Sequence, residues 1–135
     1  MAWPIPAIDE DNRAFWTGGR EGCLLITRCE DCGRRTHPPV PRCPFCLSDR
    51  AAPSPVSGRA RVYSFTINHP QWSSGLEVPY VIAVVALEEQ ADVRLLTNIV
   101  GCPVEEVAIG MPVEVEFDQR ADVFVPVFRR AAAPP

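Results

Sequence analysis

The sequence reads Cys29-Glu30-Asp31-Cys32-Gly33 and, with ten residues between Cys32 and Cys43, continues Cys43-Pro44-Phe45-Cys46. A Cys-x2-Cys turn directs two sulfurs to the same side of a tight loop. Two such knuckles enclose one tetrahedral ion with metal–sulfur bonds of about 2.3 Å. Gly33 suits the left-handed backbone behind such a turn, and Pro44 fixes φ in the second knuckle. The spacing therefore predicts a metal site with four ligands: Cys29, Cys32, Cys43 and Cys46.

The predicted ion is Zn²⁺, with one ion per chain. Four thiolates close the coordination shell, so this metal would be structural rather than catalytic. Sulfur ligation alone does not separate zinc from a rubredoxin-type iron, and two disulfides or four free thiols are the other interpretations of the pattern. Because so small a ribbon has little core of its own, the metal is expected to contribute folding free energy directly.

The residues around the cysteines predict a rubredoxin-like zinc ribbon. An apolar run, residues 23–28, predicts a strand that leads into the first knuckle. Cys23 falls in this run, and we interpret it as a small buried hydrophobe rather than a ligand. His37 lies between the knuckles and is expected to be a hydrogen-bonded loop residue. Arg34 and Arg35 belong to an arginine-rich patch suited to phosphate, an acidic partner or solvent.

A short amphipathic helix is predicted over residues 9–17, ahead of the ribbon. Asp9 is suited to cap its N-terminus, and the two glycines after Thr17 are expected to end it. Phe15 and Trp16 lie together near its C-terminal end. We expect them either to pack on the chain's own core or to anchor a partner, because so short a helix needs a surface to pack against.

Beyond the ribbon the chain is expected to be mostly β. Residues 51–55, Ala-Ala-Pro-Ser-Pro, predict a connector and the boundary between an N-terminal unit, 1–50, and a C-terminal unit, 51–135. Strands are predicted over residues 59–67, 80–87, 93–100, 112–117 and 123–128, with a helical turn at 103–107. Five strands with a helix between the third and fourth predict a five-stranded OB-fold barrel. The uninterrupted apolar run at 80–87 predicts a strand covered on both faces.

Two loops of such a barrel are expected to flank its binding surface, residues 68–79 and 119–122. The first of these loops is the longer and carries polar and aromatic side chains. The candidate contact residues in it and at its end are Asn68, His69, Trp72 and Tyr80.

Charge is distributed unevenly along the 135 residues, whose net charge is −4. Residues 28–61 hold seven arginines and three acidic residues, whereas residues 77–122 hold ten acidic residues and two arginines. An acidic barrel disfavours nucleic acid, because counterion release needs a basic surface. No apolar run approaches the roughly 20 residues of a membrane span. The N-terminus has no signal-peptide pattern and the cysteines need no oxidising compartment, so a cytoplasmic location is expected.

No catalytic constellation is evident in the sequence. His69 is the one histidine of the predicted barrel, no Ser or Cys lies in a nucleophile elbow, and no glycine-rich phosphate loop opens a helix. Cys102 follows a glycine in a predicted turn without an evident activating base, so a packed thiol is expected there. The chain is therefore expected to act through an interface.

Several motifs occur in a fairly specific order: Phe15-Trp16, Cys29-x2-Cys32-Gly33, Pro38-Pro39, Cys43-Pro44-x-Cys46, Gly58-Arg59-Ala60-Arg61-Val62-Tyr63-Ser64-Phe65-Thr66 and Ile109-Gly110-Met111-Pro112-Val113. In these residues the chain resembles a zinc-ribbon plus OB-fold family, formerly catalogued as a domain of unknown function and found beside acyl-CoA enzymes. The resemblance covers almost the whole chain. One departure is the hairpin from Glu88 to Arg94, which is longer than the glycine-containing turn expected there.

The resemblance implies an accessory subunit of a thiolase-fold enzyme, in a hetero-oligomer built on a thiolase dimer. Family members accompany acetoacetyl-CoA thiolases, hydroxymethylglutaryl-CoA synthase assemblies and thiolase-like aldolases that shorten steroid side chains in actinobacteria. In those aldolases the thiolase-like subunit cleaves a β-hydroxyacyl-CoA by a retro-aldol reaction, and the small subunit stabilises it. The resemblance thus predicts a non-catalytic subunit of an aldolase or a thiolase, with acyl-CoA near the interface. A free-standing acyl-CoA or lipid carrier is the alternative, and a single-strand nucleic-acid binder is a weaker one.

Overall fold

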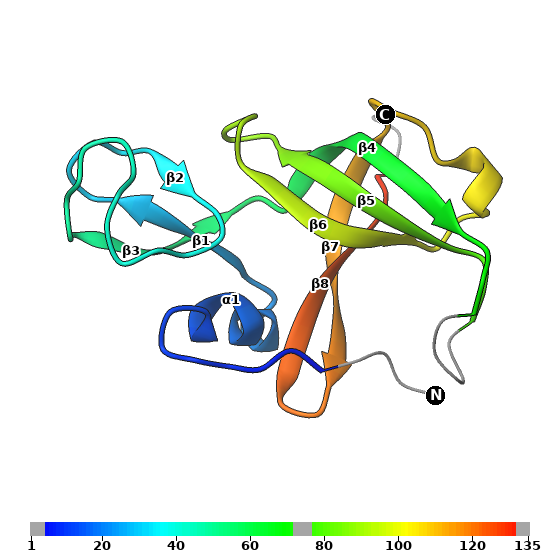
Figure 1. The fold of residues 1–135 in the computed structure, drawn as a ribbon, viewed down its shortest axis with the longest axis horizontal. Helices are drawn as coiled ribbons and strands as arrows, with labels where there is room; N and C mark the ends of the chain where they lie inside the picture. The colour runs from blue at the N-terminus through cyan, green and yellow to red at the C-terminus, as the bar shows by residue number, and fades with distance from the viewer. Residues whose placement is uncertain (1–4, 72–76, 132–135) are drawn as a thin grey trace.

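The computed structural model describes residues 5–71 and 77–131, and Trp72 lies outside them. Three parts are arranged around the middle of the molecule (Figure 1). A small sheet lies at one end of the long axis, a barrel lies at the other end, and helix α1 (Arg13–Thr17) lies beside a long hairpin that leaves the barrel. Within the described residues, every helix is too short or too polar to cross a bilayer.

The small sheet is antiparallel, with strand order β2–β1–β3. Its strands are β1 (Leu24–Cys29), β2 (Arg35–Thr36) and β3 (Ala51–Val56). The predicted apolar strand before the first knuckle is therefore confirmed as β1, which is the central strand. Both cysteine knuckles lie between β1 and β3, so the metal-ligand loops are connected to this sheet at each end.

The segment predicted as a connector, residues 51–55, is instead strand β3 and pairs along all of β1. Its prolines are tolerated because β3 is an edge strand. Pro53 is paired with Thr27 and Pro55 with Leu25, so the two prolines lie at alternate positions. Alternate positions share one side of the ladder, and a proline is allowed where its missing N–H would face away from the partner strand.

The barrel consists of five strands closed in the order β4–β5–β6–β8–β7. Its elements are β4 (Arg59–Asn68), β5 (Tyr80–Leu87), β6 (Arg94–Val100), the 3-10 helix η2 (Val104–Glu106), β7 (Pro112–Arg120) and β8 (Val123–Arg130). Neighbours are antiparallel except β6 and β8, which pair in parallel at Ile99 and Phe128. The predicted OB-fold, with a helical turn between its third and fourth strands, is confirmed.

Strands β7 and β8 extend beyond their predicted ends and form the long hairpin seen in Figure 1. Strand β5 also differs from its prediction. Val81, Val85 and their inward-facing neighbours are buried, but the alternate residues, such as Ile82, are half-buried. The apolar run is therefore a strand with one covered face, and its outer face is partly open to solvent.

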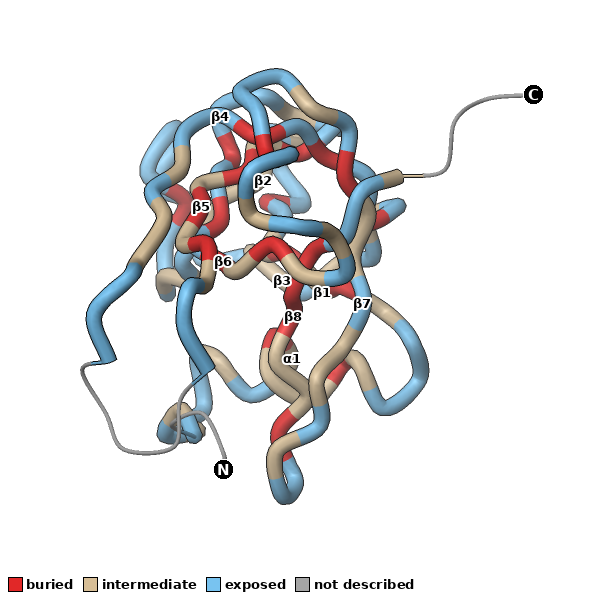
Figure 2. Tube along the Cα trace, turned by 90° about the vertical axis from the view of Figure 1, so that its right-hand side faces the viewer, coloured by how far each residue is buried: buried red, intermediate tan, exposed pale blue. Residues whose placement is uncertain are grey.

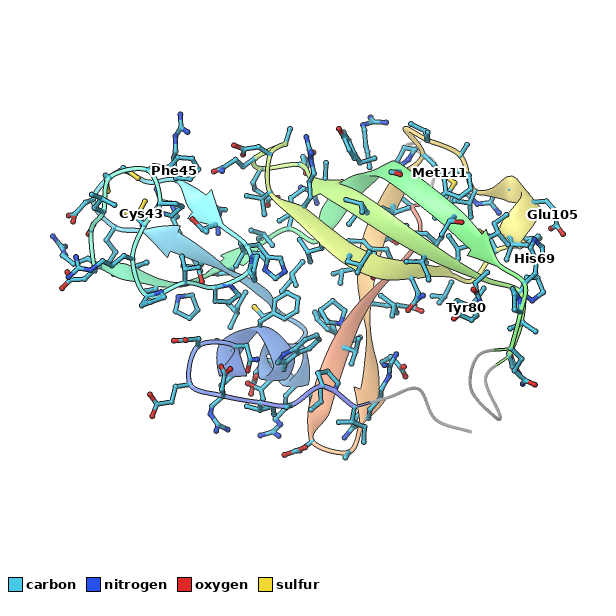
Figure 3. The ribbon with its side chains drawn as sticks, in the orientation of Figure 1. Cys43, Phe45, His69, Tyr80, Glu105 and Met111 are labelled. Carbon is cyan, nitrogen blue, oxygen red and sulfur yellow. The ribbon has the colours of Figure 1, made fainter. Side chains whose placement is uncertain are left out.

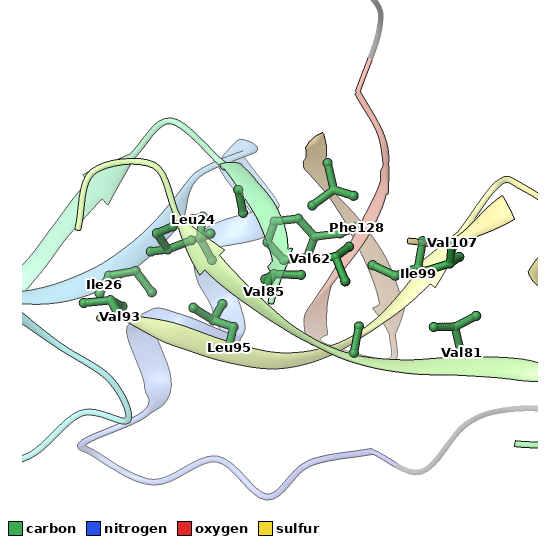
Figure 4. Packing of buried hydrophobic residues seen from close by; sticks show 14 of the residues in the cluster. Leu24, Ile26, Val62, Val81, Val85, Val93, Leu95, Ile99, Val107 and Phe128 are labelled. Carbon is green, nitrogen blue, oxygen red and sulfur yellow. The ribbon is translucent and has the colours of Figure 1, made fainter. Parts of the chain in front are cut away.

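One apolar core joins the two sheets. Buried residues alternate with less buried ones along the barrel strands, as the colours of the tube in Figure 2 show. Val62, Val85 and Phe128 fill the barrel, and Leu24 and Ile26 of β1 belong to the same cluster (Figure 4). The inner side of the ribbon sheet therefore packs on the barrel, which fixes the ribbon against it.

Helix α1 is shorter than predicted and begins at Arg13 rather than at Asp9. Asp9 and Asn12 form a reciprocal pair of hydrogen bonds, in which each side chain accepts from the other's backbone N–H. The α-helix ends at Thr17, just before the two glycines, as predicted, and the glycines begin a 3-10 turn, η1 (Gly18–Glu21). A Cβ on Gly19 would lie 2.5 Å from the ring of Phe117, so this glycine permits η1 to approach the β7–β8 hairpin.

Candidate metal centre

The four predicted ligands meet at the end of the ribbon. The Sγ atoms of Cys29, Cys32, Cys43 and Cys46 all lie within 4.8 Å of one another. Cys29 and Cys46 are 3.6 Å apart, as are Cys32 and Cys43. Sulfurs at the corners of a tetrahedron with bonds of about 2.3 Å are separated by about 3.8 Å. The cluster therefore has the dimensions of a tetrahedral metal site. All the cysteines are free, so the disulfide interpretation is not supported.

Backbone N–H groups point at the inner thiols. Cys29 and Cys43 are buried, whereas Cys32 and Cys46 are exposed. The N–H of Cys32 donates to Sγ of Cys29 over 3.4 Å, and together with contacts from Asp31 and Cys46 it lowers the pKa of the Cys29 thiol to about 6. In the second knuckle the N–H of Phe45, two residues after Cys43 rather than three, donates to Sγ of Cys43 over 3.4 Å. Donors of this kind favour the thiolate, which is the form that binds a metal.

The two knuckles have the same backbone pattern. In each knuckle the N–H of the first cysteine donates to the carbonyl five residues later, from Cys29 to Arg34 and from Cys43 to Ser48. The carbonyl of the same cysteine accepts from the N–H four residues later, that of Gly33 or of Leu47. All four bonds are 2.9 Å long. The residue after each second cysteine has positive φ, +79° at Gly33 and +66° at Leu47. The sequence analysis points to Gly33 and Pro44 but not to Leu47. The signal for Leu47 is its position directly after the second cysteine of its pair, which matches that of Gly33.

Of the predicted contact residues Phe15 and Trp16, the first is buried and the second is half-buried. Phe15 is 8% exposed and packs edge-on against half-buried Trp16, with the ring centroids 4.8 Å apart. On another side of Phe15 lies the ring of His37, 4.7 Å away. The aromatic pair thus connects α1 to the ribbon and to the shared core.

His37 does not have the hydrogen bond predicted for it. Its Nδ1 is buried and has no partner among the described residues. Burial lowers the pKa of this imidazole to about 4, because the charged form is poorly solvated there. His37 is therefore a neutral packing residue between Phe15 and the ribbon at ordinary pH.

Arg34 and Arg35 have different surroundings. The Arg34 guanidinium lies over the ring of Phe45, 4.6 Å from its centroid. The Arg35 guanidinium donates to carbonyl oxygens of Ser54 and Pro55 over 3.2 and 3.3 Å, so it spans the ribbon sheet. Arg35 is therefore engaged within the chain, whereas Arg34 lies at the surface of the second knuckle.

A side chain of the unusually long hairpin holds the ribbon to the barrel. The amide of Gln90, between β5 and β6, accepts from the Arg35 N–H over 2.9 Å and donates to the Arg35 carbonyl over 3.0 Å. These are the two bonds that a neighbouring strand would make to the edge of β2. Gln90 was not among the predicted site residues, because nothing near it in sequence identifies Arg35 as its partner.

The remaining predicted contact residues lie at the other end of the molecule. Asn68 and Tyr80 face each other at the end of the β4–β5 ladder, and His69 is exposed beside them. Figure 3 shows His69 and Tyr80 at the far end of the barrel from Cys43. The structure therefore separates the candidate residues into a ribbon group and a barrel-end group rather than gathering them in one site.

A groove of about 760 Å³ crosses β4, β5 and β7 on the barrel. Its floor includes Ala60 and Met111, and Arg59, Arg61 and Arg130 lie along it. Each guanidinium has a partner in the chain: Glu88 for Arg59 at 2.7 Å, the Gly110 carbonyl for Arg61 at 3.0 Å, and Glu106 for Arg130 at 2.8 Å. The groove is mostly apolar, and of the three arginines along it Arg59 and Arg130 are paired with carboxylates, whereas Arg61 bonds to a neutral carbonyl.

Comparison with known proteins identifies the two sheets. Residues 16–51 match the ChsH2 rubredoxin-like zinc ribbon domain, and residues 54–118 match the ChsH2 C-terminal OB-fold domain. The fold of the solved Ltp2-ChsH2(DUF35) aldolase matches with a TM-score of 0.83 and 38% identity, covering 95% of this chain and 100% of that one.

Proteins similar to this chain in sequence are named as a hydratase subunit, a scaffold protein or a thiolase subunit. A probable enoyl-CoA hydratase alpha subunit of Thermomonospora curvata is 37% identical over 95% of this chain, which spans 40% of that relative's length. A DUF35 domain-containing scaffold protein of Methanocaldococcus jannaschii is 37% identical over 70% of this chain and 67% of its own. The benzoylsuccinyl-CoA thiolase subunit BbsA of Thauera aromatica is 31% identical over 63% of this chain and 57% of its own. The chain therefore belongs to the DUF35 family of zinc-ribbon and OB-fold proteins.

Proposed function

We propose that this chain is a non-catalytic accessory subunit of a thiolase-like acyl-CoA enzyme, an aldolase or a thiolase. The observation that carries the proposal is the match along nearly the whole chain to a component of the Ltp2-ChsH2(DUF35) aldolase. Relatives named as a thiolase subunit and as a scaffold protein support it. In this proposal the partner subunit performs the carbon–carbon bond chemistry.

The side chains support a role without chemistry of its own. In the described part of the chain, the four clustered thiols form a closed set, and the buried Nδ1 of half-buried His37 has no hydrogen-bond partner. The cluster fits one structural Zn²⁺ held by Cys29, Cys32, Cys43 and Cys46. When bound, the ion would fix the two knuckles, whose N–H groups already point at the sulfurs. Free thiols also fit the reducing cytoplasm that the cysteine pattern predicts.

The test is co-expression with a thiolase-like protein encoded in a neighbouring reading frame. We expect a stable hetero-oligomer on gel filtration and no turnover of acyl-CoA by the isolated chain. Metal analysis of the purified chain should give one zinc per chain; a rubredoxin-type iron would instead be coloured. Two separate peaks at micromolar concentration, or turnover by the chain alone, would contradict the proposal.

The barrel groove favours a second candidate, a free-standing carrier of acyl-CoA or lipid. Its volume falls in the range of small-molecule sites, and its floor is apolar. Internal ion pairs of Arg59 and Arg130 weigh against it, because an anionic ligand must displace Glu88 and Glu106. Calorimetry of the isolated chain with CoA esters distinguishes the two functions: tight binding without a partner supports the carrier.

A further inference from the structure

The second knuckle carries two exposed apolar side chains. Phe45, between the last two cysteines, is 47% exposed, and Leu47, directly after Cys46, is 69% exposed. Figure 3 shows Phe45 close to Cys43 in the ribbon. Together with the neighbouring Arg34 and Arg42, these two residues form a surface that we call the knuckle tip.

Leu47 has a backbone conformation that its side chain disfavours. The first knuckle has Gly33 at the equivalent position, with φ +79°, and the second has Leu47 with φ +66°. A residue with a Cβ is strained in this left-handed region, whereas glycine is not. Because Leu47 is also largely exposed, packing against the described residues does not offset the strain. The knuckle hydrogen bonds set this conformation, but they do not account for an exposed leucine at a position that glycine would fill without strain.

Two guanidinium groups are fixed beside these side chains. Arg34 stacks on the ring of Phe45, and Arg42 donates to the carbonyl oxygen of Leu47 over 3.0 Å. Among the described residues, neither Arg34 nor Arg42 forms an ion pair with a carboxylate, whereas Arg50 pairs with two acidic residues of the first knuckle. The knuckle tip therefore combines exposed apolar area with positive charge that the chain does not neutralise.

We propose that the knuckle tip docks into an apolar depression rimmed by carboxylates on the thiolase-like partner, which rests on the function proposed above. Phe45 and Leu47 are the apolar anchors of this contact, and Arg34 and Arg42 supply the complementary charge. Anionic lipid is the less favoured ligand. Two side chains bury less apolar surface than one acyl chain, which by itself gives only marginal membrane binding.

The variant Leu47→Gly separates docking from folding. Zinc-loaded full-length chain is titrated calorimetrically against the co-expressed thiolase-like subunit, and its melting temperature is measured alone. We expect Kd to rise at least tenfold, about 1.4 kcal/mol, while the melting temperature of the isolated chain rises because glycine relieves the strain. If Leu47 had a purely structural role, the Leu47→Gly chain would be more stable than wild type and would bind the partner equally well.

Two further variants and one control complete the test. Phe45→Ser is expected to weaken binding by a similar factor. Arg34→Gln is expected to weaken it several-fold and to reduce the dependence of Kd on salt. The control, Ile109→Ser, removes an aliphatic side chain that is 71% exposed in the segment between η2 and β7, and should leave Kd unchanged.

Several results would overturn the docking site. Unchanged Kd for both Leu47→Gly and Phe45→Ser would do so, as would equal weakening by Ile109→Ser. Sedimentation of the wild-type chain with phosphatidylserine vesicles, lost in Phe45→Ser while the complex persists, would assign the tip to membranes instead. If the wild-type chain forms no complex at all, the proposed function is refuted and the docking site with it. If the wild-type chain forms the complex and the variants bind equally well, only the docking site is refuted.

Discussion

The ribbon and the barrel are stabilised in different ways. Among the buried hydrophobic residues described, the ribbon contributes Leu24, Ile26, Cys29 and Cys43, and two of these four are proposed metal ligands. The barrel contributes a continuous set of inward-facing side chains from all five of its strands. The barrel core is therefore built by apolar burial, whereas we propose that the ribbon depends on a metal and on the barrel surface against which β1 packs.

Metal removal should give the largest difference in stability between the ribbon and the barrel. We expect chelation, or Cys43→Ser, to unfold residues 24–56 while the barrel stays folded, because structural zinc supplies about 10–16 kcal/mol in small zinc domains. Hydrogen exchange would show fast amides in β1 and β3 and continued protection in β5 and β8. Cys102→Ser, a matched change outside the cluster, should leave both regions protected. Equal loss of protection in the barrel would show that the two regions fold as one unit.

The junction between the regions should be the next most sensitive position. Gly58, between β3 and β4, has φ +84°, and a Cβ there would overlap Cγ1 of Val115. Gly58→Ala combines backbone strain with this clash, so we expect a loss of about 2 kcal/mol or more in the free energy of unfolding. Gly110→Ala is the control, since Gly110 has φ +87° with open space at its Cβ. Equal losses in the two variants would assign the whole effect to backbone strain.

Acid should weaken the ribbon side through His37. Its pKa is about 4 in the folded chain and near 6.5 when unfolded, so the unfolded state takes up the proton first as pH falls. Stability is then lost between about pH 6.5 and 4, on the order of 2 kcal/mol. This loss is measured by urea unfolding of wild type and His37→Phe at several pH values across this window. The difference between their free energies of unfolding cancels acid effects on the metal site, which both chains share. A wild-type dependence of stability on pH in His37→Phe would contradict this role of His37.

The smallest expected effect is at the hydrogen bonds between the regions. Gln90→Ala removes both side-chain bonds to the Arg35 backbone and should cost about 1–2 kcal/mol. The loss should appear as faster hydrogen exchange in β2, with little change in the barrel. Gln119→Ala removes only a local bond to the Ala121 carbonyl, so it should have a smaller effect. If the two variants behave alike, Gln90 has no special role in joining ribbon and barrel.

Features encoded by local spacing could be predicted from the sequence. The two Cys-x2-Cys turns determine the ligand cluster, because each turn places its own sulfurs. Alternating or continuous apolar runs located all five barrel strands, and the helical turn between the third and fourth gave the OB topology. Family resemblance added the thiolase-like partner, which no residue pattern in this chain identifies.

Features that depend on distant neighbours could not be predicted. Strand β3 contains prolines that normally interrupt strands, and its pairing to β1 makes it an edge where they are allowed. The sequence predicts too early a start for helix α1, because Asp9 caps a turn rather than the helix itself. Gln90 and Arg35 are 55 residues apart, so their contact is invisible to spacing arguments. The hydrogen bond predicted for His37 is absent, because the tertiary fold packs its ring against Phe15, which the sequence does not reveal.

The most direct test of the proposed accessory role is reconstitution of activity. The thiolase-like partner is held at fixed concentration, purified chain is added in steps, and cleavage or condensation of a β-hydroxyacyl- or β-ketoacyl-CoA is followed. We expect no turnover by this chain alone and a rate that rises with added chain until it saturates. Full activity of the partner without the chain, or turnover by the chain without the partner, would contradict it.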